Sequence, residues 1–206
     1  MMLDVFTCGP YGTQVYLILQ EKEKVAILID AAPDSFSQLE SKVKGYTIHL
    51  FLTHGHWDHI GDAHLFKEKL SAKIYFPEAD SYWLNPDHQR LITPPSYTFV
   101  SFKPDVYLKE ETEIQLGNLK MKVLPLPGHT EGQIGIYDEA NGRIFVGDTL
   151  FRNGFGRTDL YGGSSKVLRE SLQKLFQVLP PATLVYPGHG PQTTLAQERS
   201  NFRFLN

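Results

Sequence analysis

The stretch Thr47–His59 reads TIHLFLTHGHWDH and divides into an apolar half and a histidine-rich half. Thr47–Thr53 has a continuous apolar centre, which predicts a buried β-strand. Four side chains of the metal-ligand type then fall within six residues: His54, His56, Asp58 and His59. Because the backbone turns where a strand ends, these side chains can point into one cleft. One ion cannot take all four together with ligands from elsewhere, whereas two adjacent ions can.

Three further candidates share a local pattern, in which a predicted strand ends, a glycine follows, and a ligand-type side chain comes next. They are His129 after the strand 119–126, Asp148 after the strand 143–146, and His189 after the strand 184–186. Taken singly, such a residue is more often a turn residue or a satisfied core group. Because sites assemble where strands end at one edge of a sheet, the dense histidine run makes all three stronger candidates. We predict that they complete the metal centre.

The elements around these residues alternate between strands and helices. In the first half, the sequence predicts strands at 14–20, 24–30, 47–53 and 73–76, and helices at 35–43 and 60–70. In the second half, it predicts strands at 113–116, 119–126, 132–137, 143–146 and 184–186, a hairpin turn at Asn141-Gly142, and a helix at 164–178. This order predicts an α/β fold with helices packed on sheets. We expect one domain, 1–206, with two similar halves at roughly 1–104 and 105–206.

Residues 80–104 interrupt the alternation with four prolines among several aromatic side chains. This composition predicts a loop or an irregular helical insertion. Two interpretations stay open here: a packed surface excursion, or a wall or lid of a cleft.

Composition and charge argue against nucleic acid and membranes as binding partners. The net charge is −3 with acids and bases interspersed, so no basic stripe for nucleic acid is visible. No apolar run has the length needed to cross a bilayer, and the start MMLDVFTCGP does not resemble a secretion signal. Cys8 is the only cysteine, so a metal must be held by imidazoles and carboxylates. We expect a cytoplasmic protein that acts on a small molecule; its oligomeric state is not readable from the sequence.

These residues resemble the metallo-β-lactamase superfamily, in its short, single-domain branch of glyoxalase II-like (hydroxyacylglutathione hydrolase-like) proteins. The resemblance covers nearly the whole chain, in five parts: Asp30 ending ILID, the run His54–His59, His129 in PGHT, Asp148 in GDTLF and His189 in YPGHG. It implies a four-layer αββα sandwich with the site at one edge of its two sheets. It also implies a division of ligands: His54, His56 and His129 on one metal, Asp58, His59 and His189 on the other, and Asp148 bridging both.

The same resemblance implies a metallohydrolase that cleaves a thioester similar to an S-2-hydroxyacylglutathione, through attack by a hydroxide that bridges the two metals. Asp58 would also orient this hydroxide, and Asp30 would support the ligands from behind. Arg157, in NGFGRTDL, either grips an anionic group of the substrate or forms a loop salt bridge with Asp159. Two divalent ions are expected, zinc first, with iron or manganese as alternatives. Gly190 and Pro191 replace a tyrosine of the family, which leaves glutathione recognition open.

Two other functions remain as alternatives. A persulfide dioxygenase with one iron would keep the same histidines, and His54, His129 and Asp148 would form its two-histidine, one-carboxylate face. The GRTD stretch at Gly156–Asp159 resembles that branch as well. A non-catalytic metal-binding protein is the third alternative, and the filling of all seven ligand positions argues against it.

Overall fold

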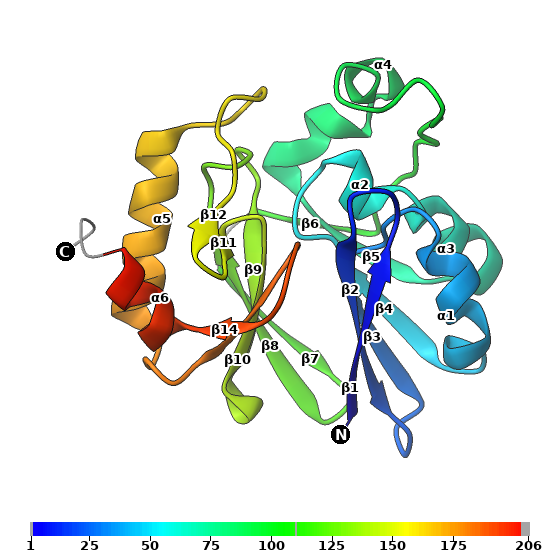
Figure 1. The fold of residues 1–206 in the computed structure, drawn as a ribbon. Helices are drawn as coiled ribbons and strands as arrows, with labels where there is room; N and C mark the ends of the chain where they lie inside the picture. Colours follow the sequence, from blue (N-terminus) through cyan, green and yellow to red (C-terminus); the bar gives the residue numbers. More distant parts are fainter. Residues whose placement is uncertain (1, 110, 203–206) are drawn as a thin grey trace. The chain divides into compact units, whose positions relative to one another are not determined.

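The computed structural model describes residues 2–109 and 111–202. The chain forms two compact units: Met1–Lys109 with Leu116–Asn118, and Glu110–Gln115 with Leu119–Asn206. Each unit carries a six-stranded sheet with helices against it, and Figure 1 labels these elements.

The sheet of the first unit follows the order of the chain. Its strands are β1 (Met2–Cys8), β2 (Thr13–Gln20), β3 (Val25–Ile29), β4 (Thr47–Phe51), β5 (Lys73–Pro77) and β6 (Val106–Leu108). The first three pair antiparallel, whereas β3, β4, β5 and β6 pair parallel. Because parallel strands end at the same edge of a sheet, the residues after β3 and β4 come close together. Asp30 directly follows β3, and the histidine run follows β4 after Leu52 and Thr53.

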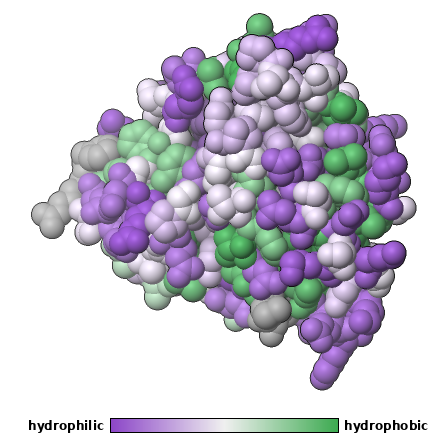
Figure 2. Space-filling view, turned by 45° about the vertical axis from the view of Figure 1, so that its right-hand side comes forward, coloured by the Kyte–Doolittle hydropathy of each residue, from purple (hydrophilic) through white to green (hydrophobic). Residues whose placement is uncertain are grey.

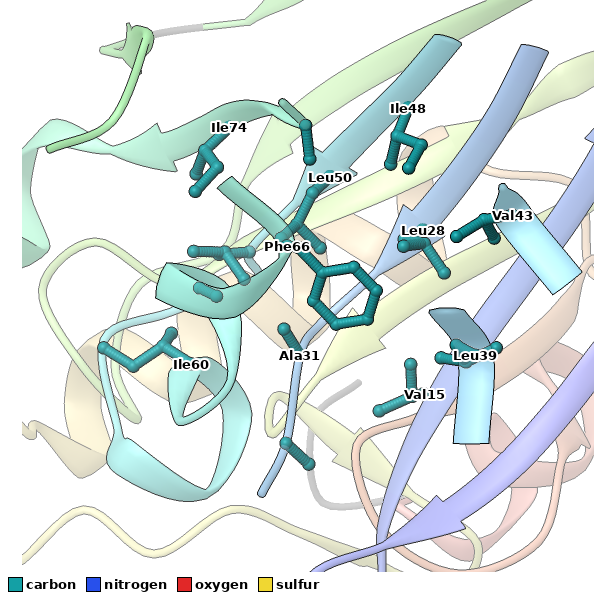
Figure 3. Close-up of a cluster of buried hydrophobic side chains, with 14 of the residues drawn as sticks. Val15, Leu28, Ala31, Leu39, Val43, Ile48, Leu50, Ile60, Phe66 and Ile74 are labelled. Atoms are coloured by element: carbon teal, nitrogen blue, oxygen red, sulfur yellow. The ribbon is translucent and has the colours of Figure 1, made fainter. Parts of the chain in front are cut away.

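Two crossover helices cover one face of this sheet. They are α1 (Ser35–Val43), as predicted, and α3 (Ala63–Leu70), which follows the short α2 (Trp57–Ile60). Leu28 and Leu50 of the central strands, Leu39 of α1 and Phe66 of α3 are fully buried in one cluster (Figure 3). Burying each such side chain stabilises the fold by roughly 1.5–3 kcal/mol. This core fixes the sheet edge from which the histidine run emerges.

The predicted insertion is irregular and helical. It begins with a 3₁₀ helix, η1 (Glu78–Leu84), continues into α4 (Pro86–Gln89), and then runs without regular structure to β6. The side chain of Asn85 accepts a hydrogen bond from the Asp87 amide and caps α4. Trp83 and Gln89 are buried, so this segment packs on the protein as more than a surface loop.

The sheet of the second unit has the order β14-β13-β10-β9-β8-β7. Its strands are β7 (Thr112–Leu116), β8 (Leu119–Pro125), β9 (Ile134–Asp138), β10 (Arg143–Gly147), β13 (Leu184–Pro187) and β14 (Thr193–Thr194). The predicted hairpin between β9 and β10 is confirmed, through the 3₁₀ turn η2 (Glu139–Asn141) and Gly142 at φ 61°. β11 (Leu150–Phe151) and β12 (Gly154–Phe155) form a separate pair.

The helix α5 (Ser165–Val178) joins β12 to β13 and packs on this second sheet (Figure 1). The Ser164 side chain accepts from the Val167 amide and caps the helix that the sequence predicts at 164–178. Leu168, Leu172 and Leu175 recur at helical spacing and are buried in one cluster with strand residues and with α6 (Leu195–Asn201). β10 and β13 pair parallel, so their ends also share one edge.

The surface is mixed in character. On the face that Figure 2 shows, hydrophobic residues lie in small groups among hydrophilic ones. Of the helices within 2–109 and 111–202, none combines the length and the apolar character that crossing a membrane requires.

Candidate metal centre

The predicted ligands of the first unit follow β4 in a tight turn and a short helix. β4 ends at Phe51, residues 53–55 form a bend, His56 stands at the N-terminus of α2, and α2 carries Asp58 and His59. The four residues are at most 8% exposed. The ligand atoms of His54 lie within 4.8 Å of those of His56 and of His59. Asp58 Oδ2 lies 3.7 Å from His59 Nε2. The run therefore gathers its four ligand-type groups, as the sequence predicts.

Asp30 connects these histidines to the preceding strand. Its backbone adopts φ 65°, and its carboxylate is 1% exposed. Oδ1 accepts from the Thr53 amide at 2.7 Å, and Oδ2 accepts from the Thr53 hydroxyl at 2.9 Å. Oδ2 also lies 2.7 Å from Nδ1 of His59. Asp30 therefore contacts His59, one of the predicted ligands, and its supporting role stays a prediction.

In the neutral imidazoles of His59 and His54, these bonds determine which ring nitrogen carries the proton. A carboxylate only accepts, so His59 donates from Nδ1 to Asp30, and its Nε2 holds a lone pair. The Thr53 hydroxyl gives its one proton to Asp30, so it accepts from Nδ1 of His54 at 3.1 Å. Nε2 of His54 is then also unprotonated. A metal-binding imidazole has this form, with one nitrogen donating to the protein and the other directed at the ion.

A hydrogen bond from strand β2 orients the Asp58 side chain. The hydroxyl of Thr13, at the start of β2, donates to Asp58 Oδ2 at 3.4 Å. Trp57, beside it, is 1% exposed and contacts Tyr11 and Tyr97 edge-on and at a tilt, with ring centroids 5.2 and 4.7 Å away. The aromatic contacts hold the first turn of α2 in place, and Asp58 with it.

In the second unit, Asp148 lies between two histidines. Its Oδ2 is 3.6 Å from Nε2 of His129 and 3.5 Å from Nε2 of His189. The Gly188 amide donates to the carbonyl of Gly147 at 2.7 Å, which ties together the ends of the parallel strands β10 and β13. The three strand-end residues that the sequence singles out are therefore neighbours, with Asp148 in the middle.

His129 has the same proton arrangement as His54 and His59. Its Nδ1 lies 2.8 Å from the backbone carbonyl of Arg157, which can only accept, so in the neutral ring Nε2 holds the lone pair; Nε2 lies 3.6 Å from Oδ2 of Asp148. The preceding Gly128 has φ 132°, and a Cβ there would collide with the backbone of Leu168 in α5. Glycine is required at this position because the ligand loop passes directly against the helix.

The loop after β12 approaches the ligands through a glycine. A Cβ on Gly156 would collide with the Asp148 carbonyl and would lie 3.0 Å from Nδ1 of His129. The next residue, Arg157, forms a bidentate salt bridge with Asp159, in which Nε and Nη2 donate to Oδ1 and Oδ2 at 2.7 and 2.8 Å. Both side chains are exposed. This bond lowers the pKa of the Asp159 carboxyl to about 2. The loop salt bridge considered in the sequence analysis is thus present, and the Arg157 carbonyl orients His129.

The other histidines have structural partners. Nδ1 of His49 lies 3.0 Å from the Tyr75 hydroxyl, and Nδ1 of His64 donates to the Gly61 carbonyl at 3.1 Å. His88 stacks on Tyr82 with ring centroids 3.7 Å apart.

Several supporting residues were not found by sequence reasoning. Asp80 and Gln89 of the insertion bond the backbone of Gly55, at 2.8 and 2.6 Å. Gln133 accepts from the Asp148 amide at 3.3 Å. Thr53 had a usable signal, because it directly precedes the histidine run and ends the predicted strand. The other residues stand alone in the sequence, and only the folded chain brings them to the ligands.

Comparison with known proteins gives consistent results. The sequence model described as the metallo-beta-lactamase superfamily matches residues 8–189. The probable metallo-hydrolase YqgX of Bacillus subtilis is 31% identical over 201 residues, which cover 96% of this chain and 94% of that protein. The hydroxyacylglutathione hydrolase GloC of Haemophilus influenzae is 32% identical over 196 residues, which cover 92% of this chain and 91% of that protein.

Solved structures of metallo-beta-lactamase-like proteins are also similar to this chain. The BLEG-1 B3 metallo-beta-lactamase matches with a TM-score of 0.89, 30% identity and full coverage of both chains. TTHA1623 in a di-iron-bound form matches at 0.81 and 32% identity, covering 98% of this chain and 99% of the other. ETHE1 from Myxococcus xanthus matches at 0.79 and 29% identity, covering 98% and 83%. The predicted fold class, a mixed α/β fold with two sheets and helices, is confirmed.

Proposed function

Because this chain belongs to the metallo-β-lactamase superfamily, we propose that it is a metal-dependent hydrolase that uses two divalent ions to cleave a thioester. The family match includes every predicted ligand. We assign one ion to His54, His56 and His129, the other to Asp58, His59 and His189, and a bridging role to Asp148. This assignment is a proposal from the sequence and from the chemistry of each unit.

The arrangement of imidazole protons carries the proposal. In three histidines, His54, His59 and His129, Nδ1 donates to the protein and leaves Nε2 as a base. His64 also donates from Nδ1, so the arrangement points to a metal centre only together with the grouping of the ligand atoms: those of His54 and His59 lie within 4.8 Å of each other, and Nε2 of His129 lies 3.6 Å from Asp148. The donor set contains imidazoles and carboxylates and no thiolate, which suits zinc, iron and manganese. The residues present therefore fit the divalent ions that the family implies.

Divalent ions held by these histidines and aspartates would supply Lewis acidity, which lowers the pKa of a bound water toward about 7 and polarises a substrate carbonyl. The chain's own contribution is to hold the ligand atoms and to orient the water, a role that we give to Asp58. A thioester suits this arrangement because its thiolate leaves without a strong acid; a free thiol has a pKa of about 8.5. The match to the GloC protein, named a hydroxyacylglutathione hydrolase, supports the same substrate class.

Arg157 is the candidate for binding an anionic part of the substrate. Its guanidinium already pairs with Asp159, so a substrate carboxylate must displace that partner. Exposed ion pairs contribute little to stability because water screens them, and this exchange is therefore cheap. We propose that Arg157 tunes affinity for the substrate and takes no part in bond cleavage.

The experiment that tests the proposal joins metal analysis with turnover. Protein made without added metal is measured by elemental analysis and assayed with S-lactoylglutathione. We expect two metal equivalents per chain, zinc in the first place, and thioester hydrolysis that a chelator abolishes and metal restores. Two metals with no thioester turnover would refute the substrate class and leave the metal-dependent hydrolase in place. A chain that binds no divalent ion would refute the whole proposal.

One observation favours a second candidate, a persulfide dioxygenase with a single iron. Asp148 and His129 are neighbours within one unit and supply two of the three ligands of a two-histidine, one-carboxylate iron site. One iron per chain, oxygen uptake with glutathione persulfide and no thioester hydrolysis would select this function.

A further inference from the structure

The peptide groups between the two histidines of the HGH stretch are held by side chains from the insertion. The Gly55 amide donates to Oδ2 of Asp80 at 2.8 Å, and the Gly55 carbonyl accepts from Nε2 of Gln89 at 2.6 Å. Asp80 is 1% exposed and Gln89 is fully buried. The amide belongs to the planar peptide that follows His54, and the carbonyl belongs to the one that precedes His56. Each bond therefore fixes one of the two peptide planes.

Trp83 completes the contact. A Cβ on Gly55 would lie 2.5 Å from the Cβ of Trp83, so the tryptophan rests directly on the glycine backbone. Its ring meets the imidazole of His56 edge-on, with centroids 4.9 Å apart and planes at 79°. Gln89 also donates to the Trp83 carbonyl at 2.7 Å, which connects the end of α4 to η1. Backbone and ring contacts thus come from the single segment 78–89.

The turn at 53–55 has no helix or strand to hold it, since β4 ends at Phe51 and α2 begins at Trp57. The directions of the Cα–Cβ bonds of His54 and His56 depend on the peptide planes that flank Gly55. Small losses of direction matter at a metal centre, because ligand atoms must sit within a few tenths of an ångström of their ideal distances.

We propose that Asp80 and Gln89 are positioning residues for His54 and His56, so that segment 78–89 supports the metal centre. This inference rests on the metal-binding part of the proposed function and not on its substrate. Partners behind metal ligands typically change metal affinity by 10- to 100-fold when they are removed. A segment that only covers the surface would change the stability of the chain and leave that affinity unaltered.

The test compares Asp80→Ala with Asp80→Asn in the full chain. Alanine removes the acceptor of the Gly55 amide, whereas asparagine keeps an acceptor oxygen in the same place. Metal-free protein is titrated with Co²⁺ and with Zn²⁺ against a chromophoric chelator. The visible spectrum of bound Co²⁺ reports ligand geometry. We expect Asp80→Ala to weaken one ion by about 10- to 100-fold and to alter the Co²⁺ spectrum. Asp80→Asn should restore most of the affinity and the spectrum.

The matched control is Ser81→Ala. Ser81 lies in the same 3₁₀ helix, is partly exposed, and donates to the Glu78 carbonyl at 2.6 Å. It should lower the melting temperature of the metal-free protein at most slightly and leave both affinities at the wild-type value. Wild-type affinities and spectrum in Asp80→Ala would overturn the proposal, whatever happens to its stability.

If Asp80→Ala does not fold, Gln89→Leu decides by the same titration, and unchanged affinities in that variant overturn the proposal. A wild-type chain that binds no divalent ion would overturn this inference together with the metal part of the proposed function. A wild-type chain that binds two ions but leaves thioesters intact would refute only the substrate class. The affinities of the variants would still decide the role of the insertion.

Discussion

Replacing Asp30 with asparagine should reverse the proton arrangement of two histidines while changing only one atom. Oδ1 of Asp30 accepts from the Thr53 amide, a donor that cannot reverse. The asparagine oxygen must therefore occupy that position, and its NH₂ group takes the place of Oδ2. That group donates where the carboxylate accepted from the Thr53 hydroxyl and from His59. Nδ1 of His59 must then accept, so that the proton moves to Nε2.

The reversal passes through Thr53 to a second ligand. Once its hydroxyl accepts from the asparagine, its own proton points to Nδ1 of His54, which must accept as well. Nε2 of His54 also becomes protonated. Metal binding then has to break two hydrogen bonds to restore the original tautomers. At about 1 kcal/mol net for each bond, the penalty is about 2 kcal/mol, or roughly a thirty-fold loss of metal affinity. This magnitude lies within the range observed for such supporting residues.

The assay is a zinc titration of metal-free protein against a chelator, with thermal melting as a measure of the fold. Two variants of Thr53 separate the steps. Thr53→Ser keeps the hydroxyl and should bind zinc as the wild type does. Thr53→Val removes the hydroxyl's bonds to His54 and to Asp30 but leaves the bond between Asp30 and His59, and it should show about half of the free-energy penalty. If Asp30→Asn binds two zinc ions with wild-type affinity, the tautomer argument is wrong, and the imidazoles are oriented by other contacts.

Three further predictions address other parts of the chain. Asp148→Ala should keep the fold but lose most bound metal and nearly all hydrolysis, because its carboxylate is proposed to serve both ions; full metal content by elemental analysis would contradict this. Gly156→Ala should weaken metal binding, since its Cβ would collide with the Asp148 carbonyl, whereas Gly154→Ala has no atom within 4 Å of its Cβ and should be neutral in the same titration. Burial, and next the Asp62 carboxylate, raises the pKa of the Cys8 thiol from 9.0 to about 11. Between these values the unfolded chain binds fewer protons than the folded chain, so stability should fall as pH rises from 9 to 11. Urea unfolding of the wild type beside Cys8→Ala measures this slope, and equal slopes would contradict it.

The sequence predicts the strands of both sheets where apolar runs are long, and it misses those defined by pairing. Val25–Ile29 is apolar and buried throughout, and the apolar residues of Thr47–Phe51 are buried, so their pattern is sufficient. β1 is an edge strand with mixed exposure, and its place depends on the antiparallel register with β2. The two-residue strands β11, β12 and β14 exist only because a partner lies beside them. A short stretch of sequence does not show which strand will lie beside it, so these strands cannot be predicted locally.

The predicted helix at 60–70 is two helices in the structure, and the reason is a contact far along the chain. The first ends at Ile60, and the second begins at Ala63. Between them, a Cβ on Gly61 would collide with the Tyr97 hydroxyl, and the Asp62 amide donates to the Ala31 carbonyl at 2.8 Å. Hydrogen bonding to another strand end replaces the helical bond here. The helical periodicity of the sequence therefore cannot reveal that a bond to Ala31 interrupts the helix.

Ligands and their orientation are encoded in different ways. The ligands themselves are local, because a strand end, a glycine and a histidine or aspartate form a short pattern that one pass along the chain detects. Their orientation is non-local: Nδ1 of His59 is bonded by Asp30, and Nδ1 of His129 by the Arg157 carbonyl. The Arg157 contact uses only backbone, so no residue type could have marked it. Where such a contact brings two backbones together, a glycine is required, as at Gly156. An isolated glycine near a predicted ligand is therefore the sequence feature that can indicate such a backbone contact.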